Sequence, residues 1–180
     1  MFRRKVPLSV MRKLRESVWP SMGWGRALAY WRHRVFRTGD SACRITAGLS
    51  SGVAVSFSPF IGTHVLQAFA VAWTVRGSLL AAFIGTAIGN PSTLPFLFWI
   101  DYRIGTGLFD LFGRAETMAL PQDYTWAVIV REPLKLLLPL TAGSVVCGLV
   151  SWPLSYILLF GPVRSMRALY EQRYRKRTAA

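Results

Sequence analysis

Two polar, proline-containing stretches interrupt the most apolar part of the chain: residues 56–65 read SFSPFIGTHV, and residues 85–95 read GTAIGNPSTLP. Proline inside a helix removes a backbone hydrogen bond and clashes with the preceding turn, so buried helices of soluble proteins avoid it. A helix surface that faces lipid avoids histidine and asparagine, because burying their polar groups is costly. We therefore interpret both stretches as breaks in membrane-embedded helices. The first break is residues 56–64, and the second break is residues 90–93.

The distribution of charge indicates which part of the chain is membrane-embedded. The chain is 52% hydrophobic and only 17% charged, yet its formal net charge is +14. All of this net charge lies at the two ends, because residues 1–44 carry +9, residues 45–163 are balanced and residues 164–180 carry +5. Three apolar windows contain no Lys, Arg, Asp or Glu, namely residues 45–75, 77–100 and 136–163. A spanning helix needs about 20 mostly apolar residues, so each window is long enough to cross a membrane.

Basic residues predict the orientation, because positive charge collects on the cytoplasmic side of membrane segments. Both termini are basic and are expected to be cytoplasmic, so the number of full crossings should be even. Residues 101–132 carry three Arg against five acids and are expected on the far side. The second and third windows then cross, and the first window enters and returns as a hairpin of two half-length helices joined at the first break. Irregular backbone at membrane depth is tolerated only where protein or a polar cavity surrounds it.

The predicted fold class is an all-α integral membrane protein with a basic amphipathic N-terminal arm, a re-entrant helical hairpin and two broken or kinked transmembrane helices. Prolines inside the third window predict its kinks or breaks; they are Pro139, Pro153 and Pro162. The predicted domains are an interfacial arm at 1–43, a membrane domain at 44–163 and a basic cytoplasmic tail at 164–180. Within the membrane domain we expect the hairpin at 45–75, transmembrane helices at 77–100 and 136–163, and a far-side loop at 101–132 containing a short interfacial helix at 104–113.

The N-terminal arm combines basic residues with an apolar stripe. In its second half the stripe consists of Trp24, Leu28, Trp31 and Val35, and arginines flank it. Basic amphipathic helices with tryptophan on the apolar side lie in the interface of anionic membranes. Nucleic acid also attracts basic arms, but no zinc spacing or aromatic RNA-binding pattern accompanies this one. The expected partners are therefore membrane lipids, mainly anionic, and not nucleic acid.

The breaks supply the candidate ligand-binding residues, which are Pro59, Gly62, Thr63, His64, Asn90, Pro91, Ser92 and Thr93. His64 is ionisable, and an ionisable group at membrane depth is a functional hypothesis by default. The alternative is that His64 caps a half-helix or bonds a neighbouring carbonyl group. Asn90 either contacts a polar ligand or satisfies backbone groups freed by Pro91. The structural role is favoured for Asn90, because small polar residues commonly join packed membrane helices.

Two arginines and two pairs of glycines complete the set of candidates. Arg44 and Arg76 flank the first window and could anchor a lipid phosphate; the alternative is that they are simply positive residues on the cytoplasmic side. Glycines at i, i+4 spacing predict close approach of helices, and they are Gly48 with Gly52 and Gly85 with Gly89. For the glycines we favour this packing role over any chemical one.

The sequence does not predict catalysis. No acidic residue lies inside an apolar window, and the motifs of zinc proteases, serine hydrolases and nucleotide-binding loops do not occur. Cys43 and Cys147 have no histidine cluster nearby, so their spacing does not indicate a metal site. We predict that the protein is not an enzyme and that it uses neither a metal nor a cofactor.

The two breaks together resemble a known family. Residues 59–64 fit a P-x-x-G-x-H pattern and residues 89–95 fit a G-N-P-x-T-x-P pattern. Both patterns resemble bacterial membrane proteins classed as domain of unknown function 2062, and the resemblance covers roughly residues 36–160. Some members of that family are joined to glycosyltransferase domains. The resemblance therefore implies a link to the cell envelope or to lipid-linked sugars, with an envelope glycosyltransferase as a partner.

The function that we expect is binding or translocation of an anionic lipid, or of a lipid-linked envelope precursor, at a site built from the two breaks. Arg44 and Arg76 would attract its head group. The alternative is a non-transporting membrane scaffold that recruits envelope-biosynthesis enzymes, in which the breaks are only structural. The expected location is the bacterial inner membrane, with several crossings and both termini cytoplasmic. A monomer of 180 residues is small for a pore, which favours a homo-oligomer.

Overall fold

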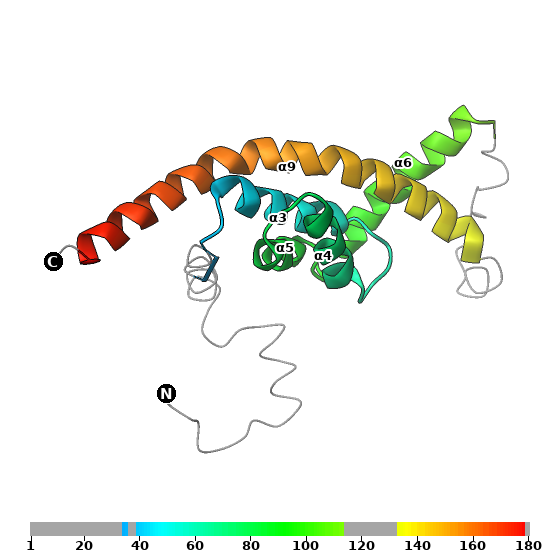
Figure 1. Cartoon of the computed structure of the whole chain (residues 1–180). Helices are drawn as coiled ribbons and strands as arrows, with labels where there is room; N and C mark the ends of the chain where they lie inside the picture. The colour runs from blue at the N-terminus through cyan, green and yellow to red at the C-terminus, as the bar shows by residue number, and fades with distance from the viewer. Residues whose placement is uncertain (1–33, 36–38, 114–132, 179–180) are drawn as a thin grey trace, which may run out of the picture. The chain divides into compact units, whose positions relative to one another are not determined.

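The computed structural model describes residues 34–35, 39–113 and 133–178, with side chains up to residue 172 (Figure 1). The chain divides into two units, Met1–Gly39 and Asp40–Ala180, and the helices discussed below all belong to the second unit. Most of the predicted interfacial arm lies outside the described residues, as does the later part of the predicted far-side loop. All regular secondary structure in the described part of the chain is helical, which confirms the all-α class.

The first apolar window folds into two helices, α3 (Ala42–Val55) and α4 (His64–Thr74), on either side of the first break. Gly62 permits the turn into α4, because its φ of 93° lies in the left-handed region that favours glycine. α3 and α4 pack against each other. At their other ends, Arg44 Nε donates a hydrogen bond to the backbone carbonyl of Arg76 at 3.2 Å. The window is therefore a helical hairpin whose two ends lie together.

The second apolar window forms two helices joined by the second break: α5 (Leu79–Gly85), which continues into the 3-10 turn η1 (Thr86–Ile88), and then α6 (Leu94–Leu111). The structure corrects two expectations here. The helix does not end at residue 100, because α6 passes through Asp101 without interruption. The short helix expected separately at 104–113 is the C-terminal half of α6. The charged residue Asp101 does not end the helix, because it is buried where α6 packs against α9.

The third apolar window is part of one long helix, α9 (Pro133–Thr178). Of the kinks or breaks expected at its prolines, a break is not present, because the helix is continuous across all three. The region expected as a separate tail from residue 164 also continues the same helix. Proline costs a helix one hydrogen bond, and packing offsets part of this cost at Pro139, which is fully buried.

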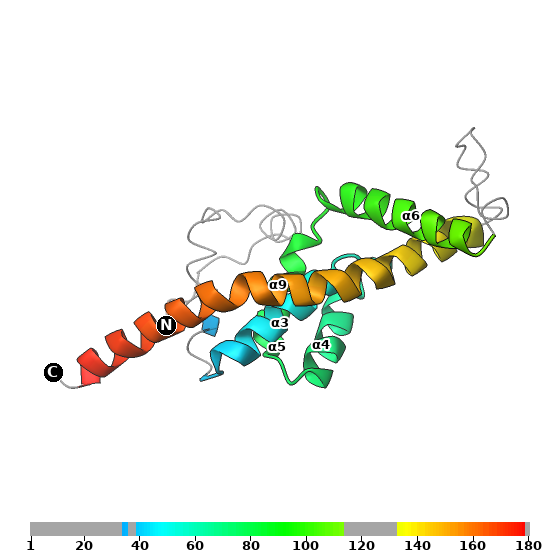
Figure 2. The same cartoon turned by 90° about the horizontal axis from the view of Figure 1, so that it is seen from above.

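α3 packs beside the middle of α9 (Figures 1 and 2). Trp152 Nε1 donates a hydrogen bond to Ser51 Oγ at 3.2 Å. One turn earlier on α9, Gly148 lies against the backbone carbonyl of Ala54. Residue numbers rise along α3 as they fall along α9, so the two helices are antiparallel.

α6 packs beside the N-terminal half of α9 (Figure 2). Gly105 lies against the backbone carbonyl of Pro139, and Gly143 lies against the backbone carbonyl of Asp101. A methyl group added to either glycine would overlap the facing carbonyl group. α6 is therefore also antiparallel to α9, and the two backbones are in direct contact where the helices cross.

The predicted glycine pairs do allow close packing between α3 and the second window. A methyl group on Gly48 would overlap the carbonyl oxygen of Ser78, and one on Gly52 would overlap backbone atoms of Gly85. The contact is reciprocal, because a methyl group on Gly85 would overlap backbone atoms of Leu49 and Gly52. The packing role that the spacing predicted is therefore confirmed.

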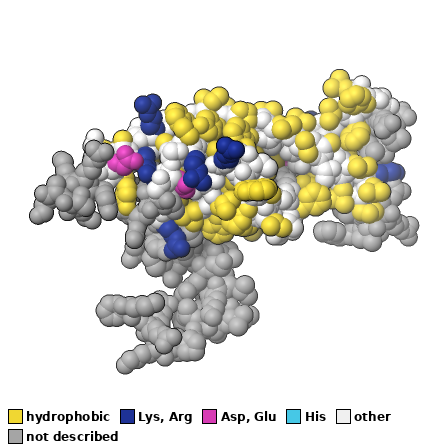
Figure 3. Space-filling model, viewed as in Figure 1, with side chains coloured by type: hydrophobic (Ala, Val, Ile, Leu, Met, Phe, Trp, Pro, Cys, Tyr) yellow, Lys and Arg dark blue, Asp and Glu magenta, His cyan; other side chains and the backbone are white. Residues whose placement is uncertain are grey.

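α9 is the described helix that is long and apolar enough to cross a membrane, over Pro133–Gln172. Only 28% of its apolar stretch is buried, whereas the core helix of a soluble protein is mostly buried. Large hydrophobic side chains remain exposed along it, including Val145, Leu149, Leu154, Ile157 and Leu158. Hydrophobic side chains cover much of the face seen in Figure 3. A surface of this kind suits contact with lipid or with another protein.

Candidate functional site

The two breaks meet in the folded chain. Ser56 is the first residue of the first break, and Gly89 directly precedes the second. A methyl group added to Gly89 would lie 3.1 Å from Ser56 Cβ and 3.2 Å from Ser56 Oγ. Ser56 is fully buried, and its hydroxyl donates to the Gly52 carbonyl at 2.9 Å. Two polar segments that are separate in the sequence therefore share one site.

Both breaks lie near the central part of the third apolar window, whose midpoint falls at residues 149 and 150. The first break begins two residues after Ala54, which lies beside Gly148 of α9. The second break ends at Thr93, eight residues before Asp101, which lies beside Gly143. Eight residues extend about 12 Å along a helix, which brings this break to the level of residue 151. On this register the first break begins near the level of residue 146 and the second break ends near the level of residue 151, about 7 Å apart along α9.

Side chains of the first break bond to the break itself. His64 Nε2 lies 3.0 Å from the carbonyl oxygen of Ser58, so the ring holds the two sides of the turn together. The Thr63 hydroxyl donates to the Phe60 carbonyl at 2.9 Å and accepts from Gln67 Nε2 at 2.6 Å. These contacts match the structural alternative for His64. The ring is only half-buried, and its second nitrogen faces no partner that the described residues provide.

Asn90 organises the second break. Its Oδ1 accepts hydrogen bonds from the Ser92 amide at 2.9 Å and from the Thr93 amide at 3.2 Å. The Thr93 hydroxyl accepts from the Asn90 amide at 3.1 Å and donates to the Ile88 carbonyl. These bonds satisfy backbone amides in the turn that precedes α6, whose own N-cap residue Thr93 makes no side-chain capping bond. The structural role that the sequence favoured for Asn90 therefore agrees with the contacts.

Most of the candidate residues remain accessible. Gly62, Thr63, Asn90, Pro91 and Ser92 are exposed, while Pro59, His64 and Thr93 are half-buried. Sequence reasoning did not include Ser56, although the signal was present. Gly48, Gly52 and Ser56 continue one series of four-residue steps along α3, and Gly85 and Gly89 form the facing series.

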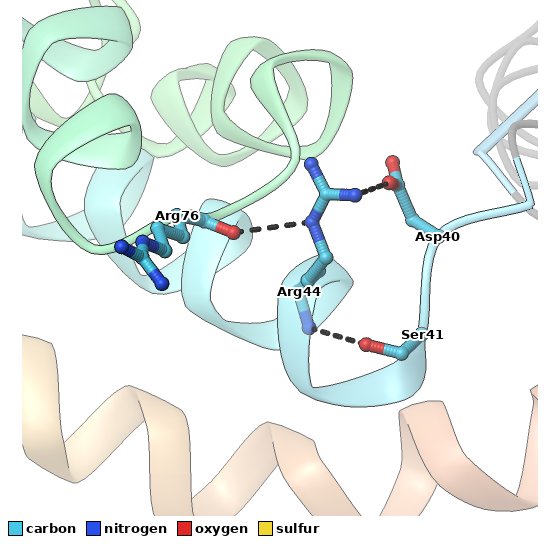
Figure 4. A network of polar contacts seen from close by, with 4 residues as sticks. All are labelled: Asp40, Ser41, Arg44 and Arg76. Atoms are coloured by element: carbon cyan, nitrogen blue, oxygen red, sulfur yellow. Dashed lines mark hydrogen bonds and ion pairs between the residues drawn. The ribbon is translucent and has the colours of Figure 1, made fainter.

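The arginines flanking the hairpin form a second group (Figure 4). Arg44 pairs with Asp40, with Nη1 and Oδ1 2.9 Å apart, and its Nε contacts the Arg76 carbonyl. The Arg44 amide donates to Ser41 Oγ at 3.3 Å, which caps α3. Both arginine side chains are exposed. Asp40 partly neutralises this group, a pairing that the sequence analysis did not propose.

The arginines and the breaks lie at opposite ends of the hairpin. Eleven residues separate Arg44 from Val55, the last residue of α3, which corresponds to about 16 Å along the helix. The structure therefore does not gather all ten candidates into one pocket. It provides one polar site at the tip of the hairpin and one basic site at its base.

Asp101 is the polar residue that the sequence analysis missed. It adjoins the end of the second apolar window, so it resembled an ordinary boundary charge. In the structure it is fully buried on the face of α6 that meets α9, and neither carboxyl oxygen has a hydrogen-bond partner in the described part of the chain. The available signal was Gly105 one turn later, because a small residue on the same face permits a close helix crossing.

Comparison with known proteins agrees with the two break motifs. A family model described as an uncharacterized protein conserved in bacteria, domain of unknown function 2062, matches residues 25–172. The chain belongs to this family. The match to the 2062 family includes both breaks, the hairpin and nearly all of α9, and it confirms the resemblance. No curated protein and no solved structure matches the chain.

Proposed function

We propose that this member of the 2062 family binds an anionic lipid or a lipid-linked envelope precursor at the two breaks and moves it across the bacterial inner membrane. The observation that carries the proposal is the contact between Ser56 and Gly89, which brings the two interruptions together. In transporters, interrupted membrane helices that meet near the membrane midplane commonly form the binding site. Helix ends exposed at such breaks offer backbone groups to a polar ligand.

In the proposed topology α9 crosses the membrane once, and α5 and α6 together form a second, broken crossing. α3 has 14 residues and a length of about 21 Å, which is too short for a hydrocarbon core of about 30 Å. The hairpin would therefore enter from one face and return near the middle. Its base carries Arg44 and Arg76, so the positive-inside rule places that base, and both termini, on the cytoplasmic side.

The exposed residues of the hairpin tip suit a lipid with a polar part. Phe60 and Ile61 are exposed beside the first break and would contact acyl chains. Ser92 is exposed in the second break, and its hydroxyl has no hydrogen-bond partner among the described residues. The basic base of the hairpin would attract the anionic head group from the cytoplasmic leaflet.

The site at the breaks is tested by adding a negative charge to it. Asn90→Asp keeps oxygen acceptors for the amides of Ser92 and Thr93, and it gives up only the long bond of 3.4 Å from Asn90 Nδ2 to the Ala87 carbonyl. The added charge would repel an anionic ligand at this exposed position. We expect native mass spectrometry of protein purified from membranes to show at least about a tenfold loss of bound anionic lipid, equivalent to roughly 1.4 kcal/mol. His64→Leu should also weaken retention if the free side of the imidazole ring contacts the ligand.

Two variants separate this effect from folding and from general charge. Gly107→Asp adds the same charge on an exposed, open position of α6 and should retain the lipid. Asn90→Leu removes the acceptor of both turn amides and should lower stability by about 1–2 kcal/mol. Retention of lipid by Asn90→Asp, or equal losses in Asn90→Asp and Gly107→Asp, would contradict a ligand site at the breaks.

The basic site is tested at Arg76, whose φ of 53° is left-handed. Asparagine tolerates this conformation, so Arg76→Asn removes the charge while Arg44 keeps its contact with the backbone carbonyl. We expect Arg76→Asn to bind less phosphatidylglycerol than the native protein in nanodiscs, and Arg76→Lys to bind nearly as much. The measurement is lipid bound per protein, with phosphatidylcholine as the neutral comparison. Equal binding by both variants would exclude a head-group role for this residue.

The second candidate function is a membrane scaffold that recruits envelope-biosynthesis enzymes, such as a glycosyltransferase. One observation favours it: His64, Asn90 and Thr93 bond to their own turns, as purely structural residues would. Under this hypothesis the exposed apolar face of α9 would pack against the recruited enzyme or a second copy of the chain. Equal, non-selective lipid binding by the native protein and by a His64→Leu/Asn90→Leu double variant would favour the scaffold.

A further inference from the structure

Asp101 occupies an unusual position where α6 crosses α9. Its carboxyl group is fully buried, and both carboxyl oxygens lack a hydrogen-bond partner among the described residues. Its backbone carbonyl lies against Gly143, and the thiol of Cys147, one turn further along α9, lies near the carboxyl group without making a hydrogen bond of ordinary geometry. Small residues thus bring the two backbones together and enclose a single carboxyl group between them.

This carboxyl group lies well inside the third apolar window. The window begins after Lys135, and Gly143 follows eight residues later, a distance of about 12 Å along α9. That distance is nearly half of a hydrocarbon core of about 30 Å. A charged group at such depth is costly, and acidic residues found there commonly relay protons or bind transported ions.

The surroundings favour a proton over a metal ion as the ligand. The described residues contain no group of three or more His, Cys, Asp or Glu side chains that could hold a metal, whereas hard cations need about six oxygen ligands. On α9, the titratable side chain facing Asp101 is Cys147. On α6, the nearby charged residue Arg103 is exposed and lies over the ring of Trp99, 5.9 Å from its centroid. A buried carboxyl group without a cationic partner avoids the cost of desolvation by binding a proton.

We propose that Asp101 is a proton-binding site and that its protonation controls the packing of α6 against α9. The carboxylate and one proton form a carboxylic acid, and no electrons are transferred. The neutral acid permits the close crossing at Gly143. Loss of the proton leaves an unpaired charge at that crossing and favours separation of the helices. α6 begins directly after the second break, so its movement changes the geometry of that break.

The charge state of Asp101 is measured by infrared spectroscopy of the full chain in lipid vesicles. The C=O stretch of a protonated carboxyl group is separate from the bands of ionised carboxylates. We expect a protonated-carboxyl band at neutral pH in the native protein that is absent from Asp101→Asn. Asp110→Asn changes an exposed acid on the same helix and should retain the band, while Cys147→Ala should shift it by removing the neighbouring thiol. A native spectrum without the band at neutral pH would overturn the assignment.

Whether protonation of Asp101 controls the packing of α6 is measured by hydrogen exchange of the backbone amides in the first turns of α6. The quantity compared is the exchange rate in the native protein divided by the exchange rate in Asp101→Asn. Intrinsic exchange changes equally with pH in both proteins and cancels in this ratio. If separation of the helices requires loss of one proton, the ratio should rise by up to about tenfold for each pH unit above the midpoint of titration. A ratio independent of pH would overturn the control of α6.

The infrared result does not rest on the proposed lipid site, because it needs no ligand. Only the link from α6 to the second break deepens the proposed function. If the native protein shows the protonated-carboxyl band and the Asn90→Asp variant retains lipid, the proton site is supported and the lipid site is rejected. Loss of lipid by Asn90→Asp without the band would preserve the lipid site and reject the proton site.

Discussion

Replacing Gly105 or Gly143 by leucine is expected to cause the largest loss of folded protein of any substitution considered for this chain. The Cβ of either new residue would overlap the backbone of the facing helix. A rotamer change cannot relieve this overlap, because the Cβ position is fixed by the backbone. Overpacking in a well-packed interior costs about 1–3 kcal/mol or more. Since α6 packs mainly against α9, separating them would leave α6 with little other support.

The same helices contain matched controls for this prediction. Gly107 of α6 and Gly161 of α9 have no atom within 4 Å of the position that a Cβ would take. Gly107→Leu and Gly161→Leu should therefore be neutral or slightly stabilising, because glycine is about 1 kcal/mol less favourable than alanine inside a helix. The measurement is thermal stability and monodispersity in detergent by fluorescence-detected size exclusion. Equal behaviour of all four variants would show that the α6–α9 crossing does not support the fold.

Cysteines placed at Ser56 and Gly89 are expected to form a disulfide almost completely on mild oxidation. A Cβ at position 89 would lie 3.1 Å from the Cβ of Ser56, close to the spacing of about 3.5–4.5 Å in disulfides. The experiment uses a chain in which Cys43 and Cys147 are replaced by alanine, so the pair consists of the two new cysteines. Cross-linking is read as the mobility shift of the chain on gels before and after reduction.

The contact between the breaks depends on the glycine crossing between α3 and α5. Gly52→Leu would overlap backbone atoms of α5 and should reduce cross-linking of the Ser56→Cys/Gly89→Cys pair severalfold. Gly161→Leu, which faces open space, should leave cross-linking unchanged. Each single cysteine variant controls for links between chains. Poor cross-linking in the otherwise native background would contradict the contact on which the proposed function rests.

These two experiments separate folding from ligand binding. The glycines at 52, 85, 105 and 143 set helix positions, so changing them should disturb the fold and the ligand site together. Asn90→Asp should disturb mainly the ligand site, because it preserves the hydrogen bonds to the amides of Ser92 and Thr93. If the glycine variants lose both folded protein and ligand while Asn90→Asp loses only ligand, the breaks bind the ligand and the glycines support the fold.

Several features could be predicted from the sequence because they depend on interactions between neighbouring residues. Uncharged windows of 24 to 31 residues and prolines at their interruptions predicted an all-helical chain with breaks after Val55 and at Asn90. Four-residue spacing of glycines predicted where helices approach closely. The break motifs were sufficient to indicate the family, which the family match confirms.

Other features depended on contacts between segments that are distant in the sequence. The three prolines of α9 predicted kinks or breaks; the helix has no break at any of them, and α6 supplies packing at Pro139. Arg44 and Arg76 are 32 residues apart, and only the folded hairpin joins them. Asp101 resembled a boundary charge, because its depth depends on which residues of α9 lie beside α6.

The sequence by itself determined where helices form and where they break, because hydrogen bonding and proline sterics act within a few residues of the chain. Only the tertiary structure decided which breaks meet, which charges pair and how deeply Asp101 is buried. The physical reason is that a helix can pack in several registers on its neighbour. Close contact at Gly105 and Gly143, and at Gly52 and Gly85, selects one register, and that register brings Ser56 to Gly89 and Asp101 to Cys147.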